Sequence, residues 1–219
     1  GKHVLCEKPM ALTVDECDRM IAACRGAGVT LGVAYYRRFY PVLIRAREIL
    51  ESGEIGHPAL AVVSAFEYYN PPPDDPRGWF LRKAESGGGP MFDFGCHRIE
   101  ALLTLLGPAV EAKGMLSNAA HRSREVEDTA SALIRFASGA QAALTVTHAS
   151  CEARDSLELF CTGGALHIPS LNAGGMTVMI SSGVRSEEHP PHPNLHFPLI
   201  EDFTRAVLDG RAPAVATGA

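Results

Sequence analysis

Lys8 is the first residue of this sequence with a type and position suited to acid–base chemistry. It follows a short apolar segment and precedes Pro9, which restricts Lys8 to extended conformations. At the carboxyl end of a strand such an ammonium can meet a substrate oxygen. Partial desolvation would lower its pKa toward the range of a working acid or base. A solvated lysine in a strand-to-helix turn is the alternative interpretation.

Asp93 and His97 form the second candidate group, four residues apart at the predicted start of a helix. This spacing puts both side chains on one helix face, about 6 Å apart along the axis. A carboxylate and an imidazole so placed can share a proton, and the three glycines before them allow a close approach to a ligand. Helix capping by Asp93 beside an incidental histidine is the alternative. We expect no metal site, because no third ligand is near in the sequence.

Aromatic and basic residues suggest where a ligand could be held. Arg37 and Arg38 lie between tyrosines, and their planar guanidinium groups can bind a phosphate or a carboxylate. Trp79 is the only tryptophan and can stack on a ring-shaped ligand. A surface loop for the arginines and a core position for Trp79 are the alternatives.

A strand–helix–strand unit at the start of the chain must position Lys8. Residues 2–6 and 29–34 predict two buried strands, and Thr13 and Glu16 have the spacing of a capping box for the helix between them. A helix between two strands of one sheet makes those strands parallel, with a right-handed crossover.

The rest of the chain predicts a sheet with a few helices. One helix is expected to follow the basic-aromatic loop at residues 35–41 and to end at about residue 51. Two more helices are expected over 91–106 and 197–208, and residues 187–196 are expected to form a loop. The expected strands are residues 59–69, 129–136, 141–149, 156–162, 165–168 and 176–181. Their short connections favour antiparallel pairing. The predicted fold class is α+β: an open, mostly antiparallel β-sheet with helices on one face, preceded by a residual βαβ piece.

Composition excludes several classes of protein. The chain has 219 residues with 46% hydrophobic and 21% charged residues, as in globular proteins, and its net charge of −5 argues against nucleic-acid binding. No apolar stretch is long enough to cross a membrane, and no signal peptide is evident. The six cysteines form no C-x-x-C pair, which favours reduced thiols and a cytoplasmic location.

Four ordered segments resemble signatures of one family. Residues 1–13 are similar to a G-K-H-V-x-x-E-K-P-x-A segment, 36–41 to an R-F-x-P loop, 52–56 to an S-G-x-I-G turn, and 87–97 to a G-G-G-x-x-x-D-x-G-x-H signature. These belong to the Gfo/Idh/MocA oxidoreductases, relatives of glucose–fructose oxidoreductase and inositol dehydrogenase. The resemblance covers nearly the whole chain.

The resemblance implies an organisation and a site. Residues 1–35 would be the last part of a dinucleotide-binding Rossmann domain, and residues 36–219 a domain for substrate binding and oligomerisation. The implied catalytic residues are Lys8, Asp93 and His97, with His97 exchanging a proton at the reacting oxygen. The implied contacts to NAD or NADP are Glu7, Lys8, Pro9, Arg38 and Trp79, the last two beside the cofactor or the substrate.

The resemblance also implies a function: transfer of a hydride between a nicotinamide and a secondary alcohol or carbonyl of a sugar, polyol or similar small molecule. A non-catalytic sensor or scaffold and an NAD-assisted glycoside hydrolase are the alternatives. The family's glycine-rich phosphate loop and its last helix and strand are absent from this sequence, so we expect a truncated chain that binds NAD(P) weakly by itself. We further expect a homodimer or homotetramer, because residues 130–146 are rich in Val and Ala and would leave an apolar sheet face exposed.

Overall fold

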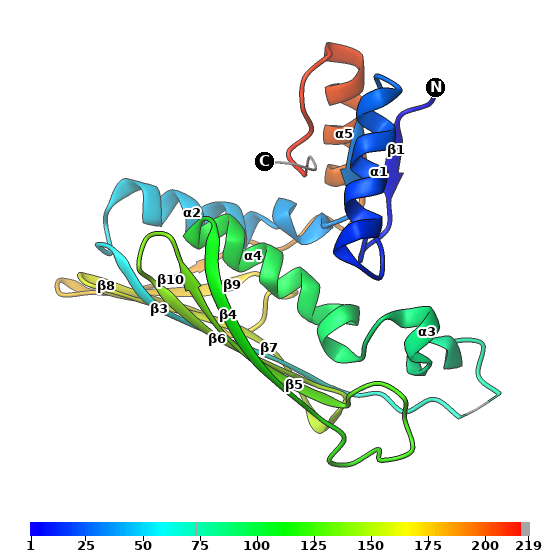
Figure 1. Ribbon diagram of the computed structural model, residues 1–219. Coiled ribbons are helices and arrows are strands. Elements are labelled where there is room, and N and C mark those ends of the chain that lie inside the picture. The colour runs from blue at the N-terminus through cyan, green and yellow to red at the C-terminus, as the bar shows by residue number, and fades with distance from the viewer. Residues whose placement is uncertain (73, 216–219) are drawn as a thin grey trace. The chain divides into compact units, whose positions relative to one another are not determined.

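The computed structural model describes residues 1–72 and 74–215 (Figure 1). By its internal contacts the chain divides into two units. The first contains Gly1–Phe39 and the chain from His192 onward, and the second is Tyr40–Pro191. Each unit is described separately below.

The first unit contains the βαβ piece that the sequence predicts. Strands β1 (Val4–Cys6) and β2 (Leu31–Val33) pair in parallel, and α1 (Val14–Gly26) connects them. The capping box is confirmed: the N–H of Glu16 donates to the Thr13 hydroxyl at 3.3 Å, and the N–H of Thr13 donates to the Glu16 carboxylate at 3.1 Å. This cap satisfies donors that the first helical turn leaves unpaired, and so fixes where the helix begins.

The last helix belongs to the same unit. Leu199 of α5 (Phe197–Asp209) is buried in one cluster with Ala34, and Leu5, Tyr35 and other partly buried residues pack against that cluster. The sequence-based boundary placed residues 36–219 in one domain, whereas these contacts group α5 with β1 and β2. The reason is the apolar face of α5, which finds its core partners at the end of β2 and in the following 3-10 turn, η1 (Tyr36–Phe39).

The second unit is built on an eight-stranded sheet in the order β10-β9-β8-β7-β3-β6-β5-β4. The strands are β3 (Pro58–Tyr68), β4 (Ala109–Ser117), β5 (Thr129–Phe136), β6 (Gln141–Thr147), β7 (Ala149–Cys161), β8 (Gly164–Ile168), β9 (Gly175–Ile180) and β10 (Gly183–Glu188). Every neighbouring pair is antiparallel except β3 with β6. The predicted fold class is therefore confirmed.

The two edge strands, β4 and β10, were missed by the sequence analysis. All residues of β4 are exposed, so no buried face imposes on its sequence the alternation of apolar and polar residues that predicts a strand. The end of β10 lies within the predicted loop 187–196, because charged side chains rather than apolar ones hold this edge.

Helices α2 (Pro41–Ser52) and α4 (Cys96–Leu106) cover one face of this sheet (Figure 1). The core between them contains fully buried Leu43, Leu102 and Leu157. The chain between β3 and α4 forms η2 (Gly78–Leu81), α3 (Lys83–Ser86) and η3 (Met91–Gly95). No helix in the described ranges is both long and apolar enough to cross a membrane.

The expectation of an exposed Val- and Ala-rich face over residues 130–146 is wrong in its details. Ala130, Ala142 and Val146 are at most 1% exposed, so they belong to the buried face. Alternation along the strands turns Leu133 the other way, and it is 65% exposed. The outer face is therefore a mixture of single apolar residues with polar ones.

A charged cluster joins α2 to the edge strand β10. The carboxylate of Glu187 accepts hydrogen bonds from Arg45 Nε at 2.9 Å and from Arg185 Nε at 2.7 Å, and lies 2.8 Å from His189 Nε2. Arg185 also pairs with Glu54. The hydrogen bond from Arg45 is the largest reason why the pKa of Glu187 falls to about 2, and Arg185 and His189 lower it further.

We expect Glu187→Gln to destabilise the protein by about 2 kcal/mol near pH 7, allowing for partial solvent screening. A carboxyl whose pKa is lowered by folding stabilises the native state above its ordinary pKa and loses that contribution as the pH falls toward its folded value. The difference between parent and variant should therefore shrink as the pH falls below about 4.5 toward 2. Urea unfolding between pH 7 and pH 3 measures this. Glu152→Gln, at an exposed pair with Arg154, is the matched control. A difference that stays constant with pH would contradict the account.

Candidate active site

Asp93 lies in a π-helical turn that leads into α4. The N–H groups of Phe92 and Asp93 both donate to the carbonyl of Gly89 at 3.0 Å. His97 follows one turn later, in α4, and is 3% exposed. A single π turn inserted before an α-helix changes the direction of the side chains it carries and is frequent at functional sites. Asp93 and His97 are thus brought onto one continuous segment of the second unit.

Gly89 allows this turn to pack closely on a neighbouring loop. A Cβ atom at Gly89 would lie 2.0 Å from the carbonyl oxygen of Glu127, closer than any real Cβ contact. The loop formed by residues 118–128 can therefore approach the turn only where no side chain intervenes. The sequence analysis interpreted the three glycines as allowing close approach to a ligand, whereas at Gly89 the partner is the protein's own backbone.

Asp128 holds this loop in place. Its carboxylate accepts hydrogen bonds from the N–H groups of Ala119, Ala120 and His121 at 3.2, 2.8 and 2.7 Å, and from the Thr129 hydroxyl at 2.9 Å. Burial acts to raise the pKa of Asp128, but these hydrogen bonds outweigh it and hold the pKa below its usual value. Asp128 is therefore a buried anion, stabilised almost entirely by backbone donors.

The main chain of Asp128 also fixes His148. The carbonyl of Asp128 accepts hydrogen bonds from the N–H of His148 at 2.8 Å and from the Thr147 hydroxyl at 3.0 Å. The His148 ring is 2% exposed and lies between the rings of Tyr69 and Phe94, with centroid distances of 5.0 and 5.2 Å.

His148 and Glu67 complete a cluster around Asp93. His148 Nε2 lies 3.6 Å from Glu67 Oε1 and 3.7 Å from Asp93 Oδ2. Burial raises the pKa of Glu67, and the nearby Asp93 carboxylate adds to that, whereas His148 and Arg98 oppose it. The sequence analysis proposed neither Glu67 nor His148. It found no third ligand beside Asp93 and His97, because Glu67 in β3 and His148 between β6 and β7 are far from them in the sequence.

Arg98 ties this segment to the sheet. Its Nε donates to the Asp155 carboxylate at 3.0 Å, and its Nη1 donates to the carbonyl of Phe94 at 2.9 Å. Arg98 is only 4% exposed, so its charge is balanced inside the protein by Asp155 of β7. One buried ion pair thus holds the junction between the π turn and α4 against a central strand.

The remaining predicted site residues belong to other elements of the chain. Lys8 follows β1 in the first unit, is half-buried, and precedes Pro9 through a cis peptide bond, while Glu7 beside it is exposed. Arg38 lies in η1 of the same unit and is half-buried. Trp79 lies in the second unit, where its ring stacks on Phe80 at 3.9 Å and stays 39% exposed.

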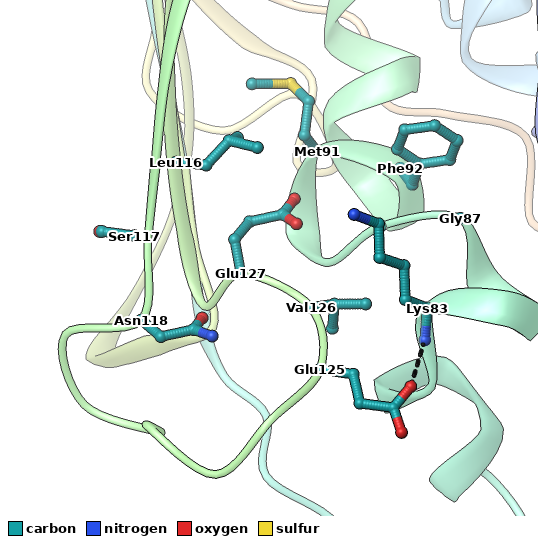
Figure 2. Close-up of a pocket in the computed structure, with 11 residues that line it drawn as sticks. Lys83, Gly87, Met91, Phe92, Leu116, Ser117, Asn118, Glu125, Val126 and Glu127 are labelled. Carbon is teal, nitrogen blue, oxygen red and sulfur yellow. Dashed lines mark hydrogen bonds between the residues drawn. The ribbon is translucent and has the colours of Figure 1, made fainter.

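A pocket of about 440 Å³ lies beside the π turn (Figure 2). Its apolar wall includes Met91, Phe92 and Leu116, and its charged residues are Lys83, Glu125 and Glu127. Figure 2 shows the Lys83 and Glu127 side chains pointing toward one another across this space. Neither Asp93 nor His97 lines it, although the π turn that contains Asp93 forms one of its walls.

Family models match both the N-terminal βαβ piece and the large sheet. Residues 43–167 match the model of the GFO/IDH/MocA C-terminal domain, and residues 1–35 match the model described as oxidoreductase family, NAD-binding Rossmann fold. The chain belongs to the Gfo/Idh/MocA family.

Several members of this family are similar to the chain. A 1,5-anhydro-D-fructose reductase of Ensifer adhaerens is 31% identical over 223 residues, covering 100% of this chain and 66% of that protein. A D-xylose 1-dehydrogenase (NADP(+)) of Haloferax volcanii is 30% identical over 222 residues, covering 98% of this chain and 65% of that protein.

A solved structure shows the same fold. The aldose-aldose oxidoreductase from Caulobacter crescentus, complexed with glycerol, superposes with a TM-score of 0.87 at 29% identity, covering 98% of this chain and 64% of that one. This chain therefore spans 64–66% of the length of the three proteins compared.

Proposed function

We propose that this chain is part of an NAD(P)-dependent oxidoreductase that transfers a hydride between a nicotinamide and a secondary alcohol or carbonyl of a sugar, polyol or similar small molecule. The family membership and the names of the relatives, a sugar reductase and a sugar dehydrogenase, support this proposal. The observation that carries it within this chain is the Asp93–His97 segment, packed on the sheet by the Gly89 contact and the Arg98–Asp155 pair.

The chain's own residues fit one end of the cofactor. Lys8 lies at the carboxyl edge of the parallel pair β1 and β2, the edge where nucleotides bind in open α/β sheets. The resemblance to the family places Lys8 at the nicotinamide end of the cofactor. Glu7, Pro9, Arg38 and Trp79 are the other residues we propose for cofactor or substrate contacts. When bound, the cofactor supplies the hydride chemistry.

Three side chains would manage charge and protons at the substrate. The Lys8 ammonium stabilises negative charge on the reacting oxygen. His97 takes the proton from that oxygen or returns it, and Asp93 holds the imidazole in the protonation state required. These groups suit an alcohol or carbonyl in a polar molecule. The six cysteines, all free, fit a reducing compartment such as the cytoplasm.

We expect Lys8→Met and His97→Asn each to lower kcat by about a hundredfold or more, the usual contribution of a positioned acid or base. The protein expressed from the complete reading frame should be assayed for NAD(P)H formation on a panel of sugars and polyols with NAD⁺ and NADP⁺. Lys113→Met and His57→Ala change exposed residues of the same types and should leave turnover unchanged.

The same assay separates the alternative functions. Release of a free sugar without net NADH would indicate NAD-assisted glycoside hydrolysis. Ligand-dependent stabilisation with no turnover on any substrate would indicate a sensor or scaffold. Turnover that survives both substitutions would remove Lys8 and His97 from the mechanism.

The outer sheet face supports a proposal of self-association through a second copy of the chain. The strand register and the alternation of exposure place several apolar side chains on the face opposite α2 and α4, each 38–65% exposed: Leu60, Leu133, Phe160 and Met179. Leu60 and Phe160 are cross-strand neighbours, so part of this face presents adjoining apolar side chains that a second copy of the chain can cover.

Light scattering coupled to size-exclusion chromatography should then give a mass of at least twice 23.4 kDa. Leu133→Arg should shift the protein toward the monomer, because a charge would be buried at the contact. Leu208→Arg, at an exposed position on α5, is the control and should not change the mass. A monomer at all concentrations would contradict this proposal.

A further inference from the structure

His148 has a hydrogen-bonding requirement that the described protein does not meet. Its ring is 2% exposed, and neither ring nitrogen has a hydrogen-bond partner among the described residues. Leaving a buried polar atom without a hydrogen bond destabilises the folded state. Buried imidazoles are therefore normally hydrogen-bonded or bound to a metal ion. The neighbouring rings of Tyr69 and Phe94 fix the plane of the imidazole but satisfy neither nitrogen.

The Nε2 atom of His148 faces two carboxylates. It lies 3.6 Å from Glu67 Oε1 and 3.7 Å from Asp93 Oδ2, beyond the 2.7–2.9 Å or so of a charge-assisted hydrogen bond. Two atoms bound to one Zn²⁺ ion, each about 2.0–2.2 Å from it, lie about 3.3–3.6 Å apart at a tetrahedral angle. The three ligand atoms all lie within 4.8 Å of one another. A small rotation of the half-exposed Glu67 side chain therefore brings all three atoms within bonding distance of one ion.

The sheet itself brings two of these ligands together. The parallel pair β3 and β6 is in register at Phe66 and Thr147, so the residues that follow them, Glu67 and His148, come to one place at the same end. The π turn then supplies Asp93 from a third element. The ligands are thus held by a strand pair and a fixed turn, as a preorganised site requires.

Charge and donor type select the class of ion. Two carboxylates with a neutral imidazole carry a formal charge of −2, which a divalent cation neutralises, while the nearby Arg98 is balanced by Asp155. Mg²⁺ and Ca²⁺ prefer oxygen ligands alone, whereas an imidazole nitrogen suits Zn²⁺ and other transition-metal ions. We infer that Glu67, Asp93 and His148 form a binding site for a divalent transition-metal ion of the Zn²⁺ type.

This inference goes beyond the proposed function and does not depend on it. The ion would share the Asp93 carboxylate with the proposed catalytic pair, so its presence would change the charge available to His97. The test therefore measures binding, with no enzymatic readout.

Calorimetric titration of the metal-free 219-residue chain with Zn²⁺ should give one site with a Kd in the micromolar range or below. Glu67→Gln and His148→Gln should each weaken binding by about tenfold or more, since each removes a ligand. Glu67 is half-exposed, so Glu67→Gln keeps the test valid even if His148→Gln fails to fold. Glu152→Gln and His167→Gln are matched controls outside the cluster and should bind as the parent does.

Co²⁺ distinguishes this site from the six free cysteines, which also bind soft metal ions. Nitrogen and oxygen ligands give visible d–d bands without a thiolate charge-transfer band, and these bands should be lost in Glu67→Gln. Three results would overturn the inference: no Zn²⁺ binding, binding equal in Glu67→Gln and the parent, or a cobalt spectrum dominated by thiolate.

Discussion

The buried carboxylate of Asp128 is the interaction on which the candidate site depends. One side chain accepts hydrogen bonds from three consecutive backbone N–H groups of the loop between β4 and β5, and the carbonyl of the same residue accepts the N–H of His148. The preceding residue, Glu127, packs its carbonyl against Gly89 at the start of the π turn. Asp128 and Glu127 therefore link the loop, the buried histidine and the segment that presents Asp93. The carboxylate holds the loop through fixed backbone donors, which need no side-chain ordering.

The second constraint is the one parallel strand pair in an otherwise antiparallel sheet. Because β3 and β6 run in the same direction, Glu67 near the end of β3 and His148 directly after β6 emerge side by side under the π turn. An antiparallel pairing would put the end of one strand beside the start of the other. Polar groups collect at this end of the sheet, while the opposite stretch of α4 buries Leu102 and Leu105 in the core. The sheet topology thus separates a polar end from an apolar, stabilising one.

Local signals in the sequence predicted much of this molecule, and non-local pairing explains what they missed. The capping box at Thr13, the βαβ unit and the strands with clear alternation were predicted, because each depends on neighbours in the chain. Edge strand β4 was missed because all its residues are exposed, and β10 because charged contacts such as Arg45 with Glu187 hold it. Asp93 and His97 could be proposed from their spacing. Glu67, Asp128 and His148 could not be proposed, because strand register and a long loop bring them to the site from distant parts of the sequence.

The most direct measurement is amide hydrogen–deuterium exchange in Asp128→Asn. Asparagine keeps the size of the side chain but has one acceptor oxygen and no charge, so it cannot retain all of the carboxylate's hydrogen bonds. The account predicts faster exchange at Ala119, Ala120, His121 and His148, with protection in β7, β8 and β9 unchanged. Unchanged protection at those four amides would show that the Asp128 carboxylate does not organise the site, and would contradict the account at its centre.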